Sequence, residues 1–209
     1  MFHSLLKRHL LIFIPCILII GAMIPLATFA KSASNDQHRR PTAQAVTNIA
    51  DIVRDGGFEK PIVTNNPKGF REYNAGQSFR TWTVASGSID LIGTYWVSAH
   101  GAQSVDLDGS NAGTIYQDLS TISGTNYSLS FALAGNPVCA PTVKQMQVWW
   151  GSTLVATLSF DTTGHSTTNM GWRYHTYKVQ ATSAVTRLSF ASLTQSACGP
   201  ALDSVTVKG

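Results

Sequence analysis

Short alternating stretches dominate the chain from residue 48 onward, and they constrain the fold more than any other feature. In residues 127–133, large apolar side chains occupy every second place, with Ser or Ala between them. Residues 143–150 repeat the pattern, with Met146, Val148 and Trp150 on one parity and Trp149 on the other. A period of two places one face of a strand in a core and the other face toward solvent or a neighbour.

Further strands are expected along the same segment, and residues that favour turns separate them. The expected strands are residues 49–53, 79–84, 88–92, 103–107, 113–119, 155–160, 174–180, 185–192 and 202–207. Turn signals between them include Ser86-Gly87, Asp108-Gly109 and Thr163-Gly164. No stretch shows a sustained helical period. About ten strands without helices predict an all-β sandwich of the jelly-roll type.

The composition agrees with this fold class and argues against some functions. Charged residues make up 12% of the chain, about half the usual share of a globular protein. Hydrophobic residues make up 44%, which is too many for a disordered chain. The formal net charge is +4, but Lys and Arg cluster only at Lys7-Arg8 and Arg39-Arg40. Nucleic acid is therefore not an expected partner.

The first thirty residues predict a signal peptide. Lys7, Arg8 and His9 form a basic start, and residues 10–26 are almost wholly apolar. The stretch at 28–30 (TFA) places small residues at the −3 and −1 positions, so we expect cleavage before Lys31 and export of the chain.

An uncleaved N-terminal anchor is the alternative, because the apolar run is long for a signal core. Membrane contact is then expected only through this segment. Residues 31–47 are polar and predict a flexible linker. Residues 48–209 are expected to form a single domain.

Two cysteines remain once Cys16 is removed with the signal peptide. An even pair in an exported chain favours a disulfide between Cys139 and Cys198. Such a bridge closes a loop of about sixty residues and contributes about 3–4 kcal/mol in the loop-entropy model. The alternative is a pair of free buried thiols. A zinc site is not expected, because neither cysteine has a Cys or His partner at ligand spacing.

No motif in the sequence indicates catalysis. The chain lacks the G-x-S-x-G motif of serine hydrolases, the P-loop and the dinucleotide fingerprint. His100, His165 and His175 do not form a metal triad at close spacing. No pair of carboxylates stands out as the acid and base of a glycosidase. We therefore expect a protein without enzymatic activity.

Several short stretches carry a family resemblance. They are residues 55–59 (DGGFE), 82–96 (WTVASGSIDLIGTYW), 101–109 (GAQSVDLDG), 113–119 (GTIYQDL), 135–136 (GN), 169–172 (NMGW) and 199–205 (GPALDSV). In this order they resemble the domain of unknown function 642 family, in its bacterial choice-of-anchor C branch. The resemblance implies a galactose-binding-like jelly roll of bacterial surface and plant cell-wall proteins, without enzymatic activity. Arg54-Asp55 is a departure, since an Asn is common before the Gly pair.

The resemblance also implies a structural calcium ion. Jelly rolls of the carbohydrate-binding type often hold calcium between their first and last strands, and Ca²⁺ takes several carboxylate and carbonyl oxygens. By resemblance, Glu59 and Asp203 would supply carboxylates and Gly57 a carbonyl, with Asp108 as a fourth candidate. The alternative is that Glu59 and Asp203 cap turns or pair with a basic side chain.

Candidate sugar-binding residues follow from the chemistry of sugars, whose rings have apolar C–H faces and polar rims. Such sites pair aromatic side chains with hydrogen-bonding groups. Trp149 is the best outward-facing aromatic residue, beside Gln145 and Gln147. The other candidates are Asp90, Tyr95, Trp96, His100, Trp82 and Trp172. The alternative for any tryptophan of a sandwich is a place in the core.

The expected function is a secreted or cell-surface module that binds cell-wall or extracellular polysaccharide around a structural calcium ion. The alternative is a protein-interaction or adhesion module of the cell surface, because the fold alone does not determine the function.

Overall fold

The computed structural model describes residues 50–64 and 66–209, which form twelve β-strands and no helix. The expectations for the signal peptide (1–30), the linker (31–47) and the start of the domain at residue 48 lie outside the described residues. None of the described residues lies in a helix that could span a membrane.

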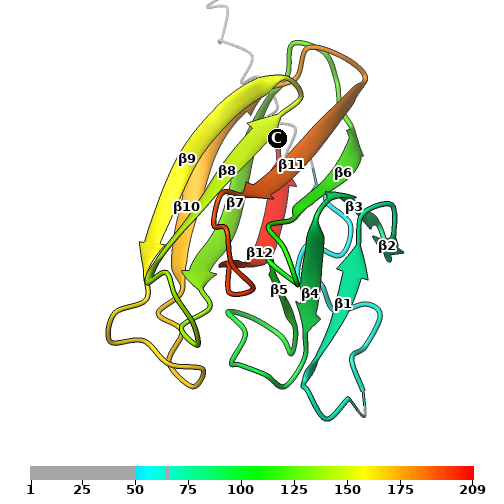
Figure 1. The fold of residues 1–209 in the computed structure, drawn as a ribbon. Helices are drawn as coiled ribbons and strands as arrows, with labels where there is room; N and C mark the ends of the chain where they lie inside the picture. Colours follow the sequence, from blue (N-terminus) through cyan, green and yellow to red (C-terminus); the bar gives the residue numbers. More distant parts are fainter. Residues whose placement is uncertain (1–49, 65) are drawn as a thin grey trace, which may run out of the picture. The chain divides into compact units, whose positions relative to one another are not determined.

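The strands form two antiparallel sheets of six strands each (Figure 1). Sheet A has the order β1-β4-β5-β12-β7-β10. Its strands are β1 (Phe70–Asn74), β4 (Ser88–Ile92), β5 (Ser104–Asp106), β12 (Pro200–Lys208), β7 (Asn126–Gly135) and β10 (Arg173–Gln180). The C-terminal strand β12 thus lies in the middle of the sheet, where it pairs with β5 and β7.

Sheet B has the order β2-β3-β6-β11-β8-β9. Its strands are β2 (Ser78–Phe79), β3 (Trp82–Ser86), β6 (Thr114–Ser120), β11 (Val185–Ser192), β8 (Val143–Trp150) and β9 (Thr153–Asp161). Neighbours in this sheet are distant in the sequence, as in the pairing of β3 with β6 and of β6 with β11. This interleaving of strands between two sheets confirms the expected sandwich.

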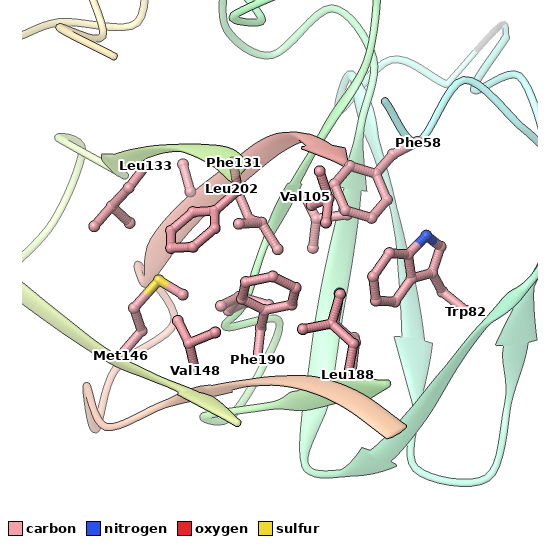
Figure 2. Close-up of a cluster of buried hydrophobic side chains, with 14 of the residues drawn as sticks. Phe58, Trp82, Val105, Phe131, Leu133, Met146, Val148, Leu188, Phe190 and Leu202 are labelled. Atoms are coloured by element: carbon pink, nitrogen blue, oxygen red, sulfur yellow. The ribbon is translucent and has the colours of Figure 1, made fainter. Parts of the chain in front are cut away.

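The core lies between the two sheets (Figure 2). The rings of Phe131 on β7 and Phe190 on β11 meet edge to face across it, with centroids 5.2 Å apart. Trp82 on β3 is completely buried, so it is a core residue and cannot bind a ligand at the surface. The alternating pattern of β8 is confirmed, because Met146, Val148 and Trp150 are all buried.

Three strand predictions need correction. The expected strand at 79–84 is instead a hairpin, in which Phe79 on β2 pairs with Trp82 on β3 and Arg80-Thr81 form the turn. Strand β1 was not predicted, because its apolar residues Phe70 and Tyr73 do not share a parity. The described part of the expected strand 49–53 is not a strand, although the Ile52 amide donates to the Val207 carbonyl over 2.9 Å.

The expected disulfide is confirmed. Cys139 and Cys198 are bonded, with Cα atoms 5.7 Å apart and a sequence separation of 59. The bridge joins the segment after β7 to the segment before β12. The Lys144 ammonium lies beneath it and donates to the carbonyls of Cys139 and Cys198, both over 2.7 Å.

Candidate functional site

Two loops cover the outer face of sheet A and bury most of the aromatic candidates there. They are residues 93–103, between β4 and β5, and residues 162–172, between β9 and β10. Trp96 is buried, and its indole Nε1 donates to the Ser104 hydroxyl on β5 over 2.8 Å. Tyr95 lies between the rings of Phe70 and Trp96, with centroids 5.4 and 5.7 Å away. The Trp172 indole donates to the Val97 carbonyl over 3.0 Å and so ties the two loops together.

Acidic residues form a row across the same face. Glu72, Asp90 and Asp106 are cross-strand partners on β1, β4 and β5. Burial raises the pKa of Asp90 to about 7, and the negative charge of Glu72 adds to the effect. Asp106 is fully buried but accepts hydrogen bonds from the Asn136 side chain and from the Gly199 amide, over 2.8 and 2.9 Å. Exposure therefore decreases along the row, from the exposed Glu72 through the half-buried Asp90 to the buried Asp106.

The turn at residues 55–59 is held against the last strand, where a calcium site was expected. The Val205 amide donates to the Gly56 carbonyl over 2.8 Å. A Cβ at Gly56 would lie 1.8 Å from the Val205 carbonyl oxygen, so only glycine fits at this approach. This contact places Glu59 beside Asp203 on β12.

Glu59 and Asp203 both hold the loop that contains His100. Asp203 accepts hydrogen bonds from the amides of Ala99 and His100 over 2.9 and 3.0 Å. Glu59 accepts one from the Ala102 amide over 2.9 Å. Burial raises the pKa of Asp203 to about 6, and the nearby charge of Glu59 contributes. His100 itself is exposed and contacts Asp203 only through its backbone.

The donor set at this place fits a calcium ion in part. Glu59 and Asp203 supply carboxylates, and the buried hydroxyl of Ser204, the residue after Asp203, has no hydrogen-bond partner. Within residues 50–64 and 66–209, no group of three or more His, Cys, Asp or Glu side chains is placed to hold a metal ion. Further oxygens would have to come from the backbone, including Gly57.

Asp108 lies elsewhere. It is completely buried, and an added Cβ at Gly199 would lie 2.5 Å from its carboxyl carbon. Gly199 precedes Asp203 by four residues, which is roughly 13 Å along a strand. The structure therefore separates Asp108 from the Glu59–Asp203 pair.

The outer face of sheet B is open and carries the remaining candidate. Trp149 lies on this face and is partly exposed. Cross-strand pairing continues from Trp149 through Ser189 on β11 to Tyr116 on β6 and Thr83 on β3. Directly paired residues share a face, and neighbouring strands lie about 4.8 Å apart. Trp149 and Tyr116 are two strands apart, so their backbones are separated by about 10 Å.

The Tyr116 ring packs against an arginine that forms a salt bridge on the same face. The Arg187 guanidinium lies 3.7 Å from the Tyr116 ring centroid. It also donates two hydrogen bonds to Asp118, over 2.7 and 2.8 Å. These bonds from Arg187 lower the pKa of Asp118. The arrangement combines a held aromatic ring with charged hydrogen-bonding groups at the surface.

A groove of about 610 Å³ runs beside Tyr116. Its walls are mostly polar and come from the segment 51–54, the β2–β3 turn, β3 and β6. They are formed by Asp51, Ile52, Arg54, Thr81, Thr83, Tyr116, Gln117, Asp118 and Ser120. The aromatic row and this groove form one continuous surface, because Thr83 and Tyr116 belong to both.

The sequence predicts one ligand-binding residue of this surface, and its other candidates lie at sheet A or in the core. Trp149 was found from its parity. Tyr116 shares the outward parity of β6 with Asp118, and this parity is the sequence signal for its place on the face. Parity alone does not bring Arg187 near Tyr116, because that depends on the register between β11 and β6. Arg54 lies on no strand, and the side chain of Gln117 holds its backbone there.

Two curated proteins resemble the chain in sequence. Halomucin of Haloquadratum walsbyi is 29% identical over 164 residues, which is 75% of this chain and 2% of halomucin. Protein TEEBE of Arabidopsis thaliana is 28% identical over 173 residues, which is 78% of this chain and 44% of that protein. The chain thus spans less than half the length of either relative.

Solved structures of carbohydrate-binding modules are also similar. A family 35 module from Paenibacillus barcinonensis has a TM-score of 0.45 and 16% identity, over 66% of this chain and 98% of the module. A family 35 module from Clostridium thermocellum has a TM-score of 0.42 and 13% identity, over 66% and 90%. The module TmCBM61, solved with β-1,4-galactotriose, has a TM-score of 0.44 and 12% identity, over 75% and 97%.

The family comparison agrees with the resemblance found in the sequence. The model of the family described as "Protein of unknown function (DUF642)" matches residues 51–208. These residues include every strand of both sheets. The chain therefore belongs to the DUF642 family.

Proposed function

We propose that this domain is a non-catalytic module that binds polysaccharide on the outer face of sheet B. The observation that carries the proposal is the row in which Trp149 and Tyr116 share one face, next to a polar groove. Sugar rings bind aromatic faces through their C–H groups, while hydroxyls take hydrogen bonds from polar side chains. A backbone spacing of about 10 Å between the two residues suits a chain of sugars that crosses the strands.

The proposed setting is outside the cell, in the cell wall or at the cell surface. The Cys139–Cys198 disulfide supports it, because such bonds persist in oxidising compartments. A polysaccharide of the wall or of the extracellular matrix is then the expected ligand.

Substitution of the two aromatic residues tests the proposal. Binding of the protein to an array of plant and bacterial polysaccharides is measured for the wild type, Trp149→Ala and Tyr116→Ala. Each substitution should weaken binding about threefold to tenfold, because each removes one aromatic face. Tyr174→Ala is the control, since Tyr174 is 64% exposed but lies on β10 of sheet A.

Two results would contradict the proposal. Equal loss of binding in the Tyr174→Ala control would place the site on sheet A. Absence of glycan binding together with capture of a surface protein would favour the adhesion function instead.

We also propose a structural calcium ion at Glu59, Asp203 and Gly57. The neighbouring Ser204 hydroxyl, which is buried without a partner, supports it. Bound calcium would join the 55–59 turn to β12 and would offset the repulsion between the two carboxylates. Asp108 is left out of this site because it lies beside Gly199.

Thermal unfolding with and without a chelator tests the calcium site. A ligand that binds only the folded state raises the melting temperature, so the chelator should lower it. Glu59→Ala should abolish this response, whereas Asp108→Asn should retain it. An identical melting curve of the wild type with and without chelator would exclude the site.

A further inference from the structure

Basic side chains line a second groove at one end of the outer face of sheet B. This groove has a volume of about 490 Å³ and is formed by Arg54, Asp55, Lys60, Arg80 and Thr81. Arg54 and Thr81 also belong to the larger groove beside Tyr116. The two grooves therefore meet, and together they connect the basic end with the aromatic row.

Arg54 is held at the junction by its backbone. Its amide donates to the Gln117 side-chain oxygen over 2.8 Å, and its carbonyl accepts from the Gln117 side-chain nitrogen over 2.9 Å. The Thr81 hydroxyl donates to the same carbonyl over 2.8 Å. These contacts fix the position of the backbone, while the Arg54 residue stays exposed to solvent.

Arg80 occupies a costly backbone conformation at the tip of the β2–β3 hairpin. Its φ is +58°, a region that glycine adopts readily and other residues rarely do. Strained positions of this kind concentrate at ligand sites, where the side chain contributes what a glycine cannot. Arg80 lines both the basic groove and the neighbouring pocket at Lys60.

The basic groove has a positive excess. Arg54, Lys60 and Arg80 face one carboxylate, Asp55, which leaves a formal charge of +2 (3 − 1). Asp55 accepts hydrogen bonds from the amides of Glu59 and Lys60, over 2.9 and 3.3 Å, so its oxygens serve the turn. In the described part of the chain, the one salt bridge is Arg187–Asp118, so these three cations have no carboxylate partner there.

We propose that the polysaccharide bound on this face is acidic, and that Arg54, Lys60 and Arg80 hold its anionic groups while its rings lie on Tyr116 and Trp149. This inference rests on the proposed function. The planar guanidinium pairs with two oxygens of a carboxylate or sulfate, and the ammonium acts as a point charge. The shared chemistry is a sugar that carries a carboxylate or a sulfate ester.

A phosphate backbone fits the same face less well than an acidic sugar chain. The aromatic row there instead suits the uncharged faces of sugar rings.

The test measures the affinity of the wild-type protein for four polymers. They are polygalacturonate, dextran sulfate, uncharged dextran and a single-stranded oligonucleotide, each at low and at physiological salt. We expect binding to one or both acidic polysaccharides, and a loss of affinity with salt because the contacts are exposed. Preference for polygalacturonate identifies a carboxylate as the anion, and preference for dextran sulfate identifies a sulfate.

Variants locate the contacts. Arg54→Gln/Arg80→Gln should weaken binding to the acidic polymer about tenfold, because each lost contact is a charge-assisted hydrogen bond. Arg71→Gln/Lys178→Gln changes the net charge equally, but both residues lie on sheet A, so binding should be unchanged. Trp149→Ala should weaken binding through the loss of an aromatic face.

Three results overturn the inference. Equal binding to dextran, unaffected by Arg54→Gln/Arg80→Gln, would leave the proposed function intact but make the basic groove irrelevant. Equal binding to the oligonucleotide would show general attraction of polyanions. Equal losses in the two double variants would show an effect of net charge only. Absence of binding to every glycan would instead contradict the proposed function itself.

Discussion

At the scale of single residues, three buried or half-buried aspartates are the most unusual groups. Asp90, Asp108 and Asp203 all have a pKa raised by burial, to about 7, 6 and 6 respectively. An ordinary aspartate in an unfolded chain loses its proton near pH 4. The folded protein therefore holds protons, between about pH 4 and 7, that the unfolded chain has released.

The pH dependence of stability follows from these protons. The contribution of Asp90 is fully present below about pH 4 and is lost as the pH rises through about 7, so the melting temperature should fall across this window. Asp90→Asn mimics the protonated side chain. It should raise the free energy of unfolding at pH 7.5 by about 1–2 kcal/mol, discounted from the full shift because Asp90 is partly exposed. Thermal unfolding from pH 4 to pH 8, with chelator present, checks this.

Asp118→Asn is the matched control for this measurement. The hydrogen bonds from Arg187 lower the pKa of Asp118, so its contribution has the opposite sign and is present above about pH 4. The control should lose a little stability at pH 7.5. A gain in both variants would show that removal of any surface charge stabilises the fold, and the explanation through burial of Asp90 would be wrong.

Parity within a strand was sufficient to predict single residues, but not their partners. It placed Trp149 outward and Trp150 in the core, as the structure has them. It could not show that Trp96 would be buried, because a loop without periodic pattern carries that residue over sheet A. Arg54 and Tyr116 are 62 positions apart in the sequence and line one groove because the side chain of Gln117, next to Tyr116, binds the backbone of Arg54.

At the scale of elements, the β2–β3 hairpin joins the fold to the proposed site. Its two strands pair through Ser78 with Thr83 and Phe79 with Trp82. The sequence predicted one continuous strand here, because Arg80 and Thr81 give no turn signal of the Gly, Asn or Pro kind. The turn is fixed by contacts outside the hairpin, since the Trp82 indole donates to the Asp55 carbonyl over 3.1 Å.

Arg80→Gly should change stability and binding in opposite directions. Glycine adopts the φ of +58° without strain, so the free energy of unfolding should rise by about 1 kcal/mol. The affinity for an acidic polysaccharide should fall, because the guanidinium is lost. Denaturant unfolding and a binding titration on the same sample measure both quantities.

Gly76→Ala provides the reciprocal control in the turn before β2. Gly76 has a φ of +84° with no atom within 4 Å of an added Cβ, so only backbone strain opposes the alanine. This variant should be destabilised by about 1 kcal/mol with unchanged affinity. A decrease in stability for Arg80→Gly would mean that contacts of the arginine outweigh its strain, and would remove the reason to assign Arg80 a binding role.

At the scale of the whole molecule, the sequence predicted the architecture better than the order of the strands. Alternation in β7 and β8 and the lack of helical periods were sufficient for an all-β sandwich. The position of β12 between β5 and β7 depends on long-range pairing, which a local pattern does not contain. The disulfide was predicted because only two cysteines remain outside the expected signal peptide.

Removal of that disulfide should lower the stability of the whole domain. The bridge between Cys139 and Cys198 closes a loop with a sequence separation of 59, which contains β8 to β11. In the loop-entropy model such a constraint contributes about 3–4 kcal/mol, so Cys139→Ser/Cys198→Ser should melt about 10 °C lower. Reduction of the wild type should give the same shift, because the variant and the reduced protein lack the same constraint. A serine variant that melts well below the reduced protein would instead point to local damage around the buried Cys198 and the Lys144 ammonium beneath it.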